Sequence, residues 1–135
     1  MKKEQAQEYI EQKLEENDTL IGFFQATKLP SMWWFLLIGV LLFLGLRVYF
    51  IGITERGLYF HKLSLFGKFE SYDFFNFEEI ESVKIGKGLI QRPMKFHFKN
   101  ERKMKVKAQL KGVERLAKLT PDLQSYIEDK IQLAN

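Results

Sequence analysis

Two neighbouring segments in the last third of the chain alternate basic and apolar residues. Residues 94–99 (MKFHFK) and 103–108 (KMKVKA) each keep this alternation throughout. We expect them to form an antiparallel hairpin, because a three-residue loop over residues 100–102 places all basic side chains on one face and all apolar ones on the other. A two-residue loop would mix the two faces. The residues assigned to this basic face and its loop are Lys95, His97, Lys99, Arg102, Lys103, Lys105 and Lys107.

The chemistry of this basic face is the binding of anions. Like charges directly opposite one another across strands are unfavourable, so a face of lysines is easier to understand if it meets a polyanion. Three interpretations stay open: a solvated face that prevents edge-to-edge aggregation, an anionic lipid surface, and nucleic acid. Nucleic acid is disfavoured, because no nucleic-acid-binding motif accompanies the charge.

Residues suited to catalysis or metal binding are few. The chain has no cysteine, which excludes disulfides, thiolate metal sites and a cysteine nucleophile. His61 and His97 lie far apart in the sequence, and neither has carboxylates at the spacing of metal ligands. Gly86-Lys87-Gly88 lacks the strand, loop and helix context of a phosphate-binding loop. We therefore expect no enzyme, no metal and no cofactor.

A long apolar stretch stands apart from the rest of the chain. Residues 32–46 contain no charged or polar side chain, and after Arg47 the apolar character resumes to residue 53. Fifteen helical residues extend roughly 22 Å, whereas about 30 Å of hydrocarbon must be crossed to span a bilayer. Length alone therefore leaves open whether this stretch spans a membrane, enters it partway or lies buried in protein.

The charge of the chain is unevenly distributed along the sequence. Residues 1–31 hold four Lys and six acidic residues, a balance of −2, and residues 47–135 hold 17 Lys or Arg and 11 acidic residues, a balance of +6. Because Lys and Arg are retained on the cytoplasmic side of membranes, we place the bulk of the chain there, at the cell membrane. The length of 135 residues is enough for one domain with one core.

The pattern of the remaining segments predicts an N-terminal helix, then seven short strands, then two C-terminal helices. Apolar residues at helical spacing predict a helix over residues 2–16. Short runs of β-branched and aromatic residues separated by turns predict an antiparallel sandwich or barrel, with strands over residues 19–27, 48–55, 58–63, 68–74, 80–85, 94–99 and 103–108. Helix is expected over residues 110–119, and again from Pro121 to Leu133, after the N-cap Thr120. The fold class is α+β: an N-terminal helix (1–17) and a single domain (18–135) containing an apolar insertion (30–47).

Two phrases of the sequence resemble the bacterial pleckstrin-homology-like family. Residues 51–60 (IGITERGLYF) are similar to the "vT-x-x-R-L-y-F" phrase of that family, and residues 77–89 (FEEIESVKIGKGL) to its "pxxxIxsVxxxxGl" strand. In this chain Gly57 stands between Arg56 and Leu58, one residue more than the family phrase. The resemblance implies a seven-stranded bent barrel capped by a C-terminal helix, usually without enzymatic activity and joined in some relatives to transmembrane helices. It carries over no binding residues, because the family shares none.

The strands on either side of the apolar stretch bear on its topology. If residues 19–27 and 48–55 are neighbouring strands of one barrel, the stretch leaves and re-enters the domain on the same side, and one crossing is impossible. We therefore favour an in-plane helix or a shallow helical hairpin as membrane anchor. A single span and a helix buried in a core or an oligomer are the alternatives. The residues assigned to the anchor are Trp33, Trp34, Phe35, Leu36, Leu37, Ile38, Leu41, Leu42 and Phe43.

Together these features predict a membrane-attached module without enzymatic activity. The apolar stretch would anchor it, and the basic face would bind anionic lipid head groups. The alternative is a protein-interaction or self-assembly module in which the apolar stretch is buried between subunits. The sequence names neither a lipid nor a protein partner.

Overall fold

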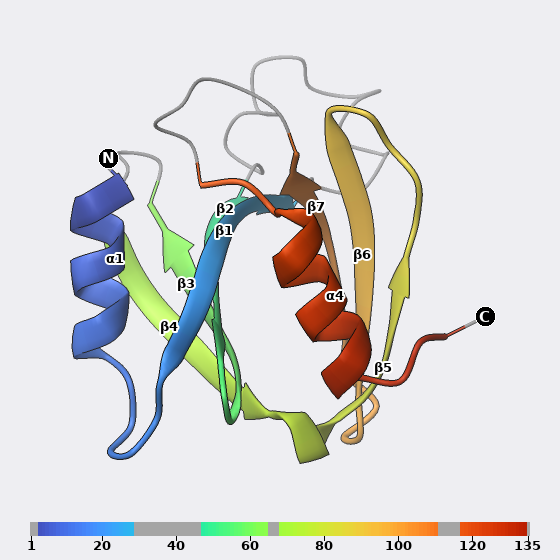
Figure 1. The fold of residues 1–135 in the computed structure, drawn as a ribbon, viewed down its shortest axis with the longest axis horizontal. Coiled ribbons are helices and arrows are strands. Elements are labelled where there is room, and N and C mark those ends of the chain that lie inside the picture. The colour runs from blue at the N-terminus through green and yellow to red at the C-terminus, as the bar shows by residue number, and fades with distance from the viewer. Residues whose placement is uncertain (1–2, 29–46, 65–67, 111–116, 135) are drawn as a thin grey trace.

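A single antiparallel sheet of seven strands organises the fold in the computed structural model, which describes residues 3–28, 47–64, 68–110 and 117–134. The sheet order is β4-β3-β2-β1-β7-β6-β5 (Figure 1). The α+β class and the seven strands expected from the sequence are confirmed. The elements are α1 (Lys3–Gln12), β1 (Leu20–Lys28), β2 (Arg47–Thr54), β3 (Gly57–Leu63), β4 (Phe69–Asn76), η1 (Phe77–Glu79), β5 (Ile80–Ile85), β6 (Gln91–Phe98), β7 (Lys103–Gln109) and α4 (Pro121–Lys130).

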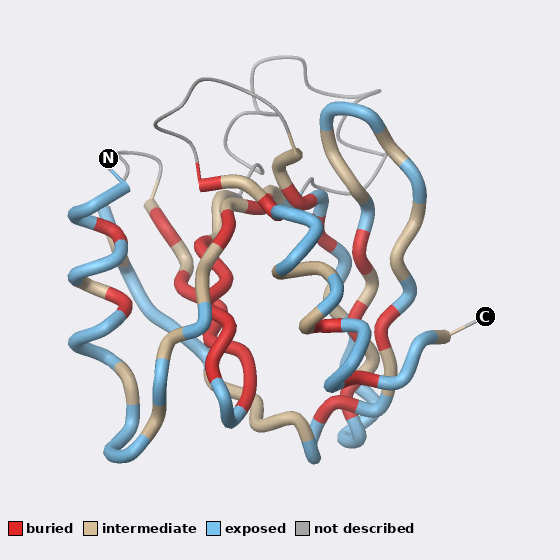
Figure 2. Tube along the Cα trace, in the orientation of Figure 1, coloured by how far each residue is buried: buried red, intermediate tan, exposed pale blue. Residues whose placement is uncertain are grey.

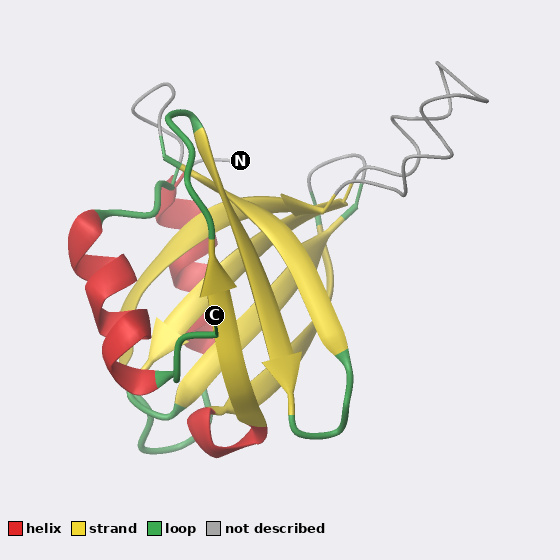
Figure 3. Ribbon diagram, turned by 90° about the vertical axis from the view of Figure 1, so that its right-hand side faces the viewer, coloured by secondary structure: helices red, strands yellow, loops and turns green. Residues whose placement is uncertain are grey.

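The sheet curls so that strands far apart in its order share one core. Phe60 of β3 packs edge-on against Phe96 of β6, with ring centroids 5.4 Å apart, although three strands separate β3 from β6 in the sheet. Phe75 of β4 likewise stacks on Phe98 of β6 at 4.1 Å. Helix α4 lies along the open side of the curl and buries Ile127 in the same core (Figure 3). The curled seven-stranded sheet with its C-terminal helix resembles the PH-like arrangement that the sequence resemblance implied.

The turn between β2 and β3 explains the additional glycine in the first family phrase. The Thr54 hydroxyl accepts hydrogen bonds from the backbone N–H groups of Arg56 and Gly57. Gly57 then pairs with Asn76 of β4, and a Cβ atom on Gly57 would lie only 2.1 Å from the Phe75 carbonyl oxygen. Real Cβ atoms do not approach so closely, so this position requires glycine.

Helix α1 covers the outer face of β1, β2 and β3 (Figure 1). Its side chains Ala6 and Ile10 are fully buried there, against Phe50 and Leu63. Ile10 lies over Gly52 of β2, where an added Cβ would come within 3.2 Å of the Ile10 Cγ2 atom. The strands beneath α1 are thus buried on both faces, as the red run along β2 and β3 shows in Figure 2.

The chain between β1 and β2 is held at both ends by paired strands. Lys28, the last residue of β1, pairs directly with Arg47, the first residue of β2. Residues 29–46 lie outside the described residues. They include all the residues assigned to the membrane anchor and the whole expected insertion (30–47) except Arg47, which is the first residue of β2. Within the part of the chain that is described, no helix has the length and apolar character needed to cross a membrane.

The C-terminal region follows the expected order with shorter helices. Thr120 caps α4, its hydroxyl accepting a hydrogen bond from the Leu123 N–H, and α4 ends at Lys130 rather than at residue 133. Of the helix expected over residues 110–119, residues 111–116 lie outside the described residues and 117–119 are not helical. After α4 the chain runs parallel to β5, where Val83 exchanges backbone hydrogen bonds with Gln132 and Ala134. This tail covers the outer edge of β5.

Candidate anion-binding face

The β6–β7 hairpin brings the predicted basic residues onto one outer face. Lys95 pairs with Lys105, and His97 pairs with Lys103. The apolar residues between them, Phe96 and Val106 among others, point into the core. The separation of basic and apolar faces predicted from the alternation is confirmed.

The predicted register of this hairpin was wrong by two residues. The loop does have an odd length of three, but it comprises residues 99–101 rather than 100–102, with the Phe98 N–H bonded to the Arg102 carbonyl. Glu101 adopts a left-handed conformation there, with φ of 71°. Moving the loop by one residue shifts every pair by two, and because side chains alternate with a period of two, the faces stay the same. Lys99 consequently leaves the ladder and lies in the turn.

A further lysine, outside the predicted hairpin, joins this face from β5. Lys84 pairs with Lys95, so that Lys84, Lys95 and Lys105 form one row across three adjacent strands. The register of β5 shifts between Ile80 and Ser82, which is a β-bulge. The bulge turns both Ile80 and Val83 toward the core and hides the alternation that would have marked Lys84 as outward-facing. We name the five lysines of β5, β6 and β7 the lysine face: Lys84, Lys95, Lys103, Lys105 and Lys107.

The lysine face carries concentrated positive charge. Its central member is Lys95, whose pKa is lowered by partial burial and by the charges of Lys105, Lys103 and Lys84. The ion pairs found among the described residues, Arg56 with Glu15 and Lys62 with Glu70, do not involve this face. The described residues therefore leave the face without a neutralising partner, and an anion that approaches it gains attraction from several ammonium groups at once.

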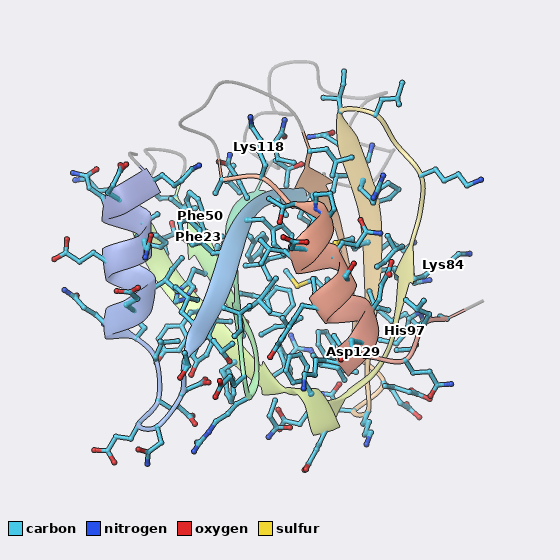
Figure 4. All side chains as sticks on the ribbon, viewed as in Figure 1. Phe23, Phe50, Lys84, His97, Lys118 and Asp129 are labelled. Atoms are coloured by element: carbon cyan, nitrogen blue, oxygen red, sulfur yellow. The ribbon has the colours of Figure 1, made fainter. Side chains whose placement is uncertain are left out.

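A shallow hollow lies on this face between the lysines. It has a volume of about 370 Å³ and opens to solvent. Its lining includes Thr27, Gly86, Pro93, Lys84, Lys95, Lys105 and Lys107. Lysine stems present methylene groups while their ammonium groups remain in water, so the hollow combines apolar walls with a cationic rim. Figure 4 shows Lys84 and His97 on the side of the molecule away from α1.

The lysine face reaches the base of the insertion at one end only. Lys107 of β7 pairs with Thr27 of β1, the residue before Lys28, at which β1 ends. Lys103 lies four residues earlier in β7, about 13 Å away at roughly 3.3 Å per residue. Lys99, in the turn beyond, and Arg102, directly after it, are farther still. Of the predicted basic residues, Lys105 and Lys107 are thus nearest to the insertion, and those of the turn are most distant.

His61 is buried beneath α1 and takes no part in the lysine face. Its side chain is fully buried, and neither ring nitrogen has a hydrogen-bond partner among the described residues. Burial, with a smaller contribution from Lys13, lowers its pKa to about 4, so the ring is neutral near pH 7. The described residues hold no cluster of three His, Cys, Asp or Glu side chains suited to a metal ion. Among the described residues, the lysine face remains the constellation with the clearest chemistry, because its clustered ammonium groups attract multivalent anions.

Comparison with known proteins shows a similarity of fold alone. No protein-family model matches the chain, and no curated protein sequence matches it. Among solved structures, it is similar to "The hSac2 domain from human phosphoinositide phosphatase Sac2", with a TM-score of 0.57 and 15% sequence identity. The match covers 94% of this chain and 77% of that one. At this identity the likeness concerns the arrangement of strands and helices.

Proposed function

We propose that this chain is a PH-like module without enzymatic activity, attached to the cytoplasmic face of the cell membrane. The apolar stretch at residues 32–46 anchors it, and the lysine face binds anionic lipid head groups. The observation that carries the proposal is the pairing of Thr27 with Lys107 beside the pairing of Lys28 with Arg47. The base of the apolar segment and the near end of the lysine face are therefore neighbours in one sheet.

The strand pairing supports an anchor that enters the bilayer and returns. Since Lys28 and Arg47 are direct partners, both ends of the apolar segment are fixed at the same end of β1 and β2. The sheet cannot lie on both sides of a membrane, so a single crossing does not fit. A bilayer contact that combines apolar burial with electrostatic attraction is the usual requirement for stable peripheral attachment.

The structural neighbour is in keeping with a lipid-directed role. It is a domain of a protein named as a phosphoinositide phosphatase, and phosphoinositides are anionic lipids. Nothing of that protein's activity is carried over, because a match at 15% sequence identity concerns the fold alone. The proposal rests on the charge and the position of the lysines.

Flotation of the full chain with vesicles tests the electrostatic half of the proposal. We expect binding to phosphatidylcholine vesicles that contain phosphatidylserine, and weaker binding as salt rises and screens the charges. Replacing Lys84, Lys95 and Lys105 with Gln should lower the vesicle partition coefficient on the order of 100-fold, from roughly fivefold per lysine near an anionic surface.

A matched triple variant separates the lysine face from net charge. Lys13 directly follows α1, and Lys62 and Lys130 lie on β3 and α4. All three lie away from the lysine face, and replacing them with Gln removes the same number of charges. This control should bind nearly as well as the parent chain. Equal losses in the two variants would show that only net charge matters. An oligomer that stays in solution without detergent and does not float would instead favour the self-assembly function.

A further inference from the structure

The loop between β5 and β6 presents two consecutive apolar side chains to solvent. Leu89 is 80% exposed and Ile90 is 64% exposed, more than any other large apolar side chain among the described residues. Two adjacent side chains so exposed are unfavourable in water, since burying each would contribute favourable free energy. A contact made by this chain is the natural reason to keep them there.

Leu89 and Ile90, which we call the apolar tip, are held in place by the surrounding backbone. The Gly86 N–H donates to the Pro93 carbonyl at 2.9 Å, and the Leu110 N–H donates to the Ile90 carbonyl at 2.9 Å. Gly88 turns so closely that an added Cβ would lie 1.8 Å from the Gln91 carbonyl oxygen. The tip is therefore a defined projection of the sheet, and little conformational entropy is lost when it binds a partner.

The tip lies at the same end of the sheet as the base of the apolar insertion. In an antiparallel meander the loops after β1, β3 and β5 fall at one end, and the loops after β2 and β6 at the other. The pairings of Thr27 with Lys107 and of Lys107 with Pro93 place the base of the tip two strands from β1. Figure 1 shows the β5–β6 loop and the ends of β1 and β2 that flank the insertion toward the same, upper side of the molecule.

The charges at the two ends of the sheet differ in sign. At the end that carries the tip, the charged residues in the described parts of the loops are all basic: Lys68, Lys87 and Lys118. At the opposite end, the connections carry seven acidic residues against four basic ones: Glu15, Glu16, Asp18, Glu55, Glu78, Glu79 and Glu101 against Lys13, Arg56, Lys99 and Arg102. Figure 4 shows Lys118 toward the first end and Asp129 toward the second. An anionic surface attracts the first end and repels the second.

We propose that the β5–β6 loop is a second membrane-contacting element, in which Leu89 and Ile90 enter the boundary between head groups and acyl chains of an anionic bilayer. Lys87, exposed between the two glycines of the tip, remains at the level of the lipid phosphates. This inference rests on the proposed membrane function and adds a defined orientation to it: the basic end faces the bilayer, and the acidic end faces away.

The absence of cysteine from the chain allows a direct test. The full chain carrying L89C is labelled with the environment-sensitive fluorophore NBD and mixed with phosphatidylcholine–phosphatidylserine vesicles. We expect a blue shift of the NBD emission and quenching by lipids with a doxyl group on the acyl chain. The matched control is I21C, because Ile21 is an exposed apolar residue near the start of β1, at the acidic end. Its label should keep the emission seen in water.

Binding measurements on unlabelled chain complete the test. Replacing Leu89 and Ile90 with Ser should lower vesicle partition by roughly tenfold or more per residue, whereas I21S should leave it unchanged. If the chain floats while the label at position 89 stays in water, this inference is overturned and the proposed function stands. If the chain does not float, both are overturned. A blue shift that appears without vesicles and grows with protein concentration would assign the tip to self-association and overturn the bilayer contact.

Discussion

The outer face of the sheet differs between its two halves. Over β2 and β3 it is apolar and covered by α1, where Phe50 packs near Phe23 and Tyr9 stacks on Phe69 at 3.9 Å. Over β5, β6 and β7 the same outer face carries the lysine face and is open to solvent. One curled sheet thus has a half buried on both sides and a half buried on one side. The first half serves stability, and the second remains available for binding.

This difference explains why the two halves are unequal in sequence. A strand with one wet face alternates between apolar and polar residues, whereas a strand covered on both faces does not. The burial of β7 follows its alternation closely, with Val106 and Ala108 inside and the lysines outside. In β3 six of seven residues are buried, including His61. We therefore expect substitutions under α1 to affect folding and substitutions on the lysine face to affect binding.

The largest expected effect is the loss of Ile10 from beneath α1. Replacing Ile10 with Ala removes a fully buried side chain from the contact with Gly52 and Phe50. We expect the free energy of unfolding to fall by about 2–5 kcal/mol, the usual cost of such a cavity. Urea unfolding followed by circular dichroism measures it. The folded variant should still bind anionic vesicles.

The control for Ile10 is Ile21, which is an isoleucine that lies 40% exposed. Replacing Ile21 with Ala should change the free energy of unfolding by no more than about 0.5 kcal/mol. If Ile10→Ala lowered the free energy of unfolding equally little, α1 would be only loosely attached. The conclusion that the half of the sheet under α1 serves stability would then be wrong.

The second effect is a dependence of stability on pH that arises from His61. The unfolded chain takes up a proton on this histidine near pH 6.5, whereas in the folded chain its pKa is about 4. The contribution of His61 is therefore complete above pH 6.5 and is lost as pH falls from 6.5 through 4. Between pH 7.5 and pH 5 this amounts to roughly 2 kcal/mol of unfolding free energy. The groups facing the ring are Tyr9, Tyr59, Phe69, Tyr72 and the ammonium of Lys13.

The replacement of His61 with Phe isolates this contribution from the titration of carboxylates. Phenylalanine keeps an aromatic ring among the same neighbours and has no proton to bind. Unfolding free energies of both chains at pH 7.5 and pH 5 give the comparison, and the parent chain should lose roughly 2 kcal/mol more than the variant. Equal losses would mean that His61 is hydrated or finds a hydrogen-bond partner.

The sequence predicted the wet half of the sheet better than the covered half. Strict alternation identified both faces of the β6–β7 hairpin. The predicted loop had the correct odd length, so the register error was an even number of residues and did not exchange the two faces. Lys84 was not identified because the bulge in β5 interrupts the alternation, and a pairing across the long β5–β6 loop cannot be read from local pattern. The covering of β2 and β3 was also not visible, since α1 buries only Ala6 and Ile10 and its apolar stripe is thin. Exposure of the β5–β6 tip depends on the tertiary arrangement, which no local pattern encodes.

The smallest expected effect concerns the stability of the lysine face itself. Lys105 lies directly opposite Lys95, so Lys105→Glu replaces a repulsion with an attraction across the two strands. Opposite charges at this spacing contribute about 0.2–1 kcal/mol, and we expect the urea midpoint at low salt to rise accordingly. The gain should vanish near 1 M NaCl, where charges are screened within about 3 Å. The same variant should bind anionic vesicles less well, so that one substitution moves stability and binding in opposite directions. A loss of both would mean that Lys105 packs as part of the fold, and the distinction between the two halves of the sheet would no longer hold.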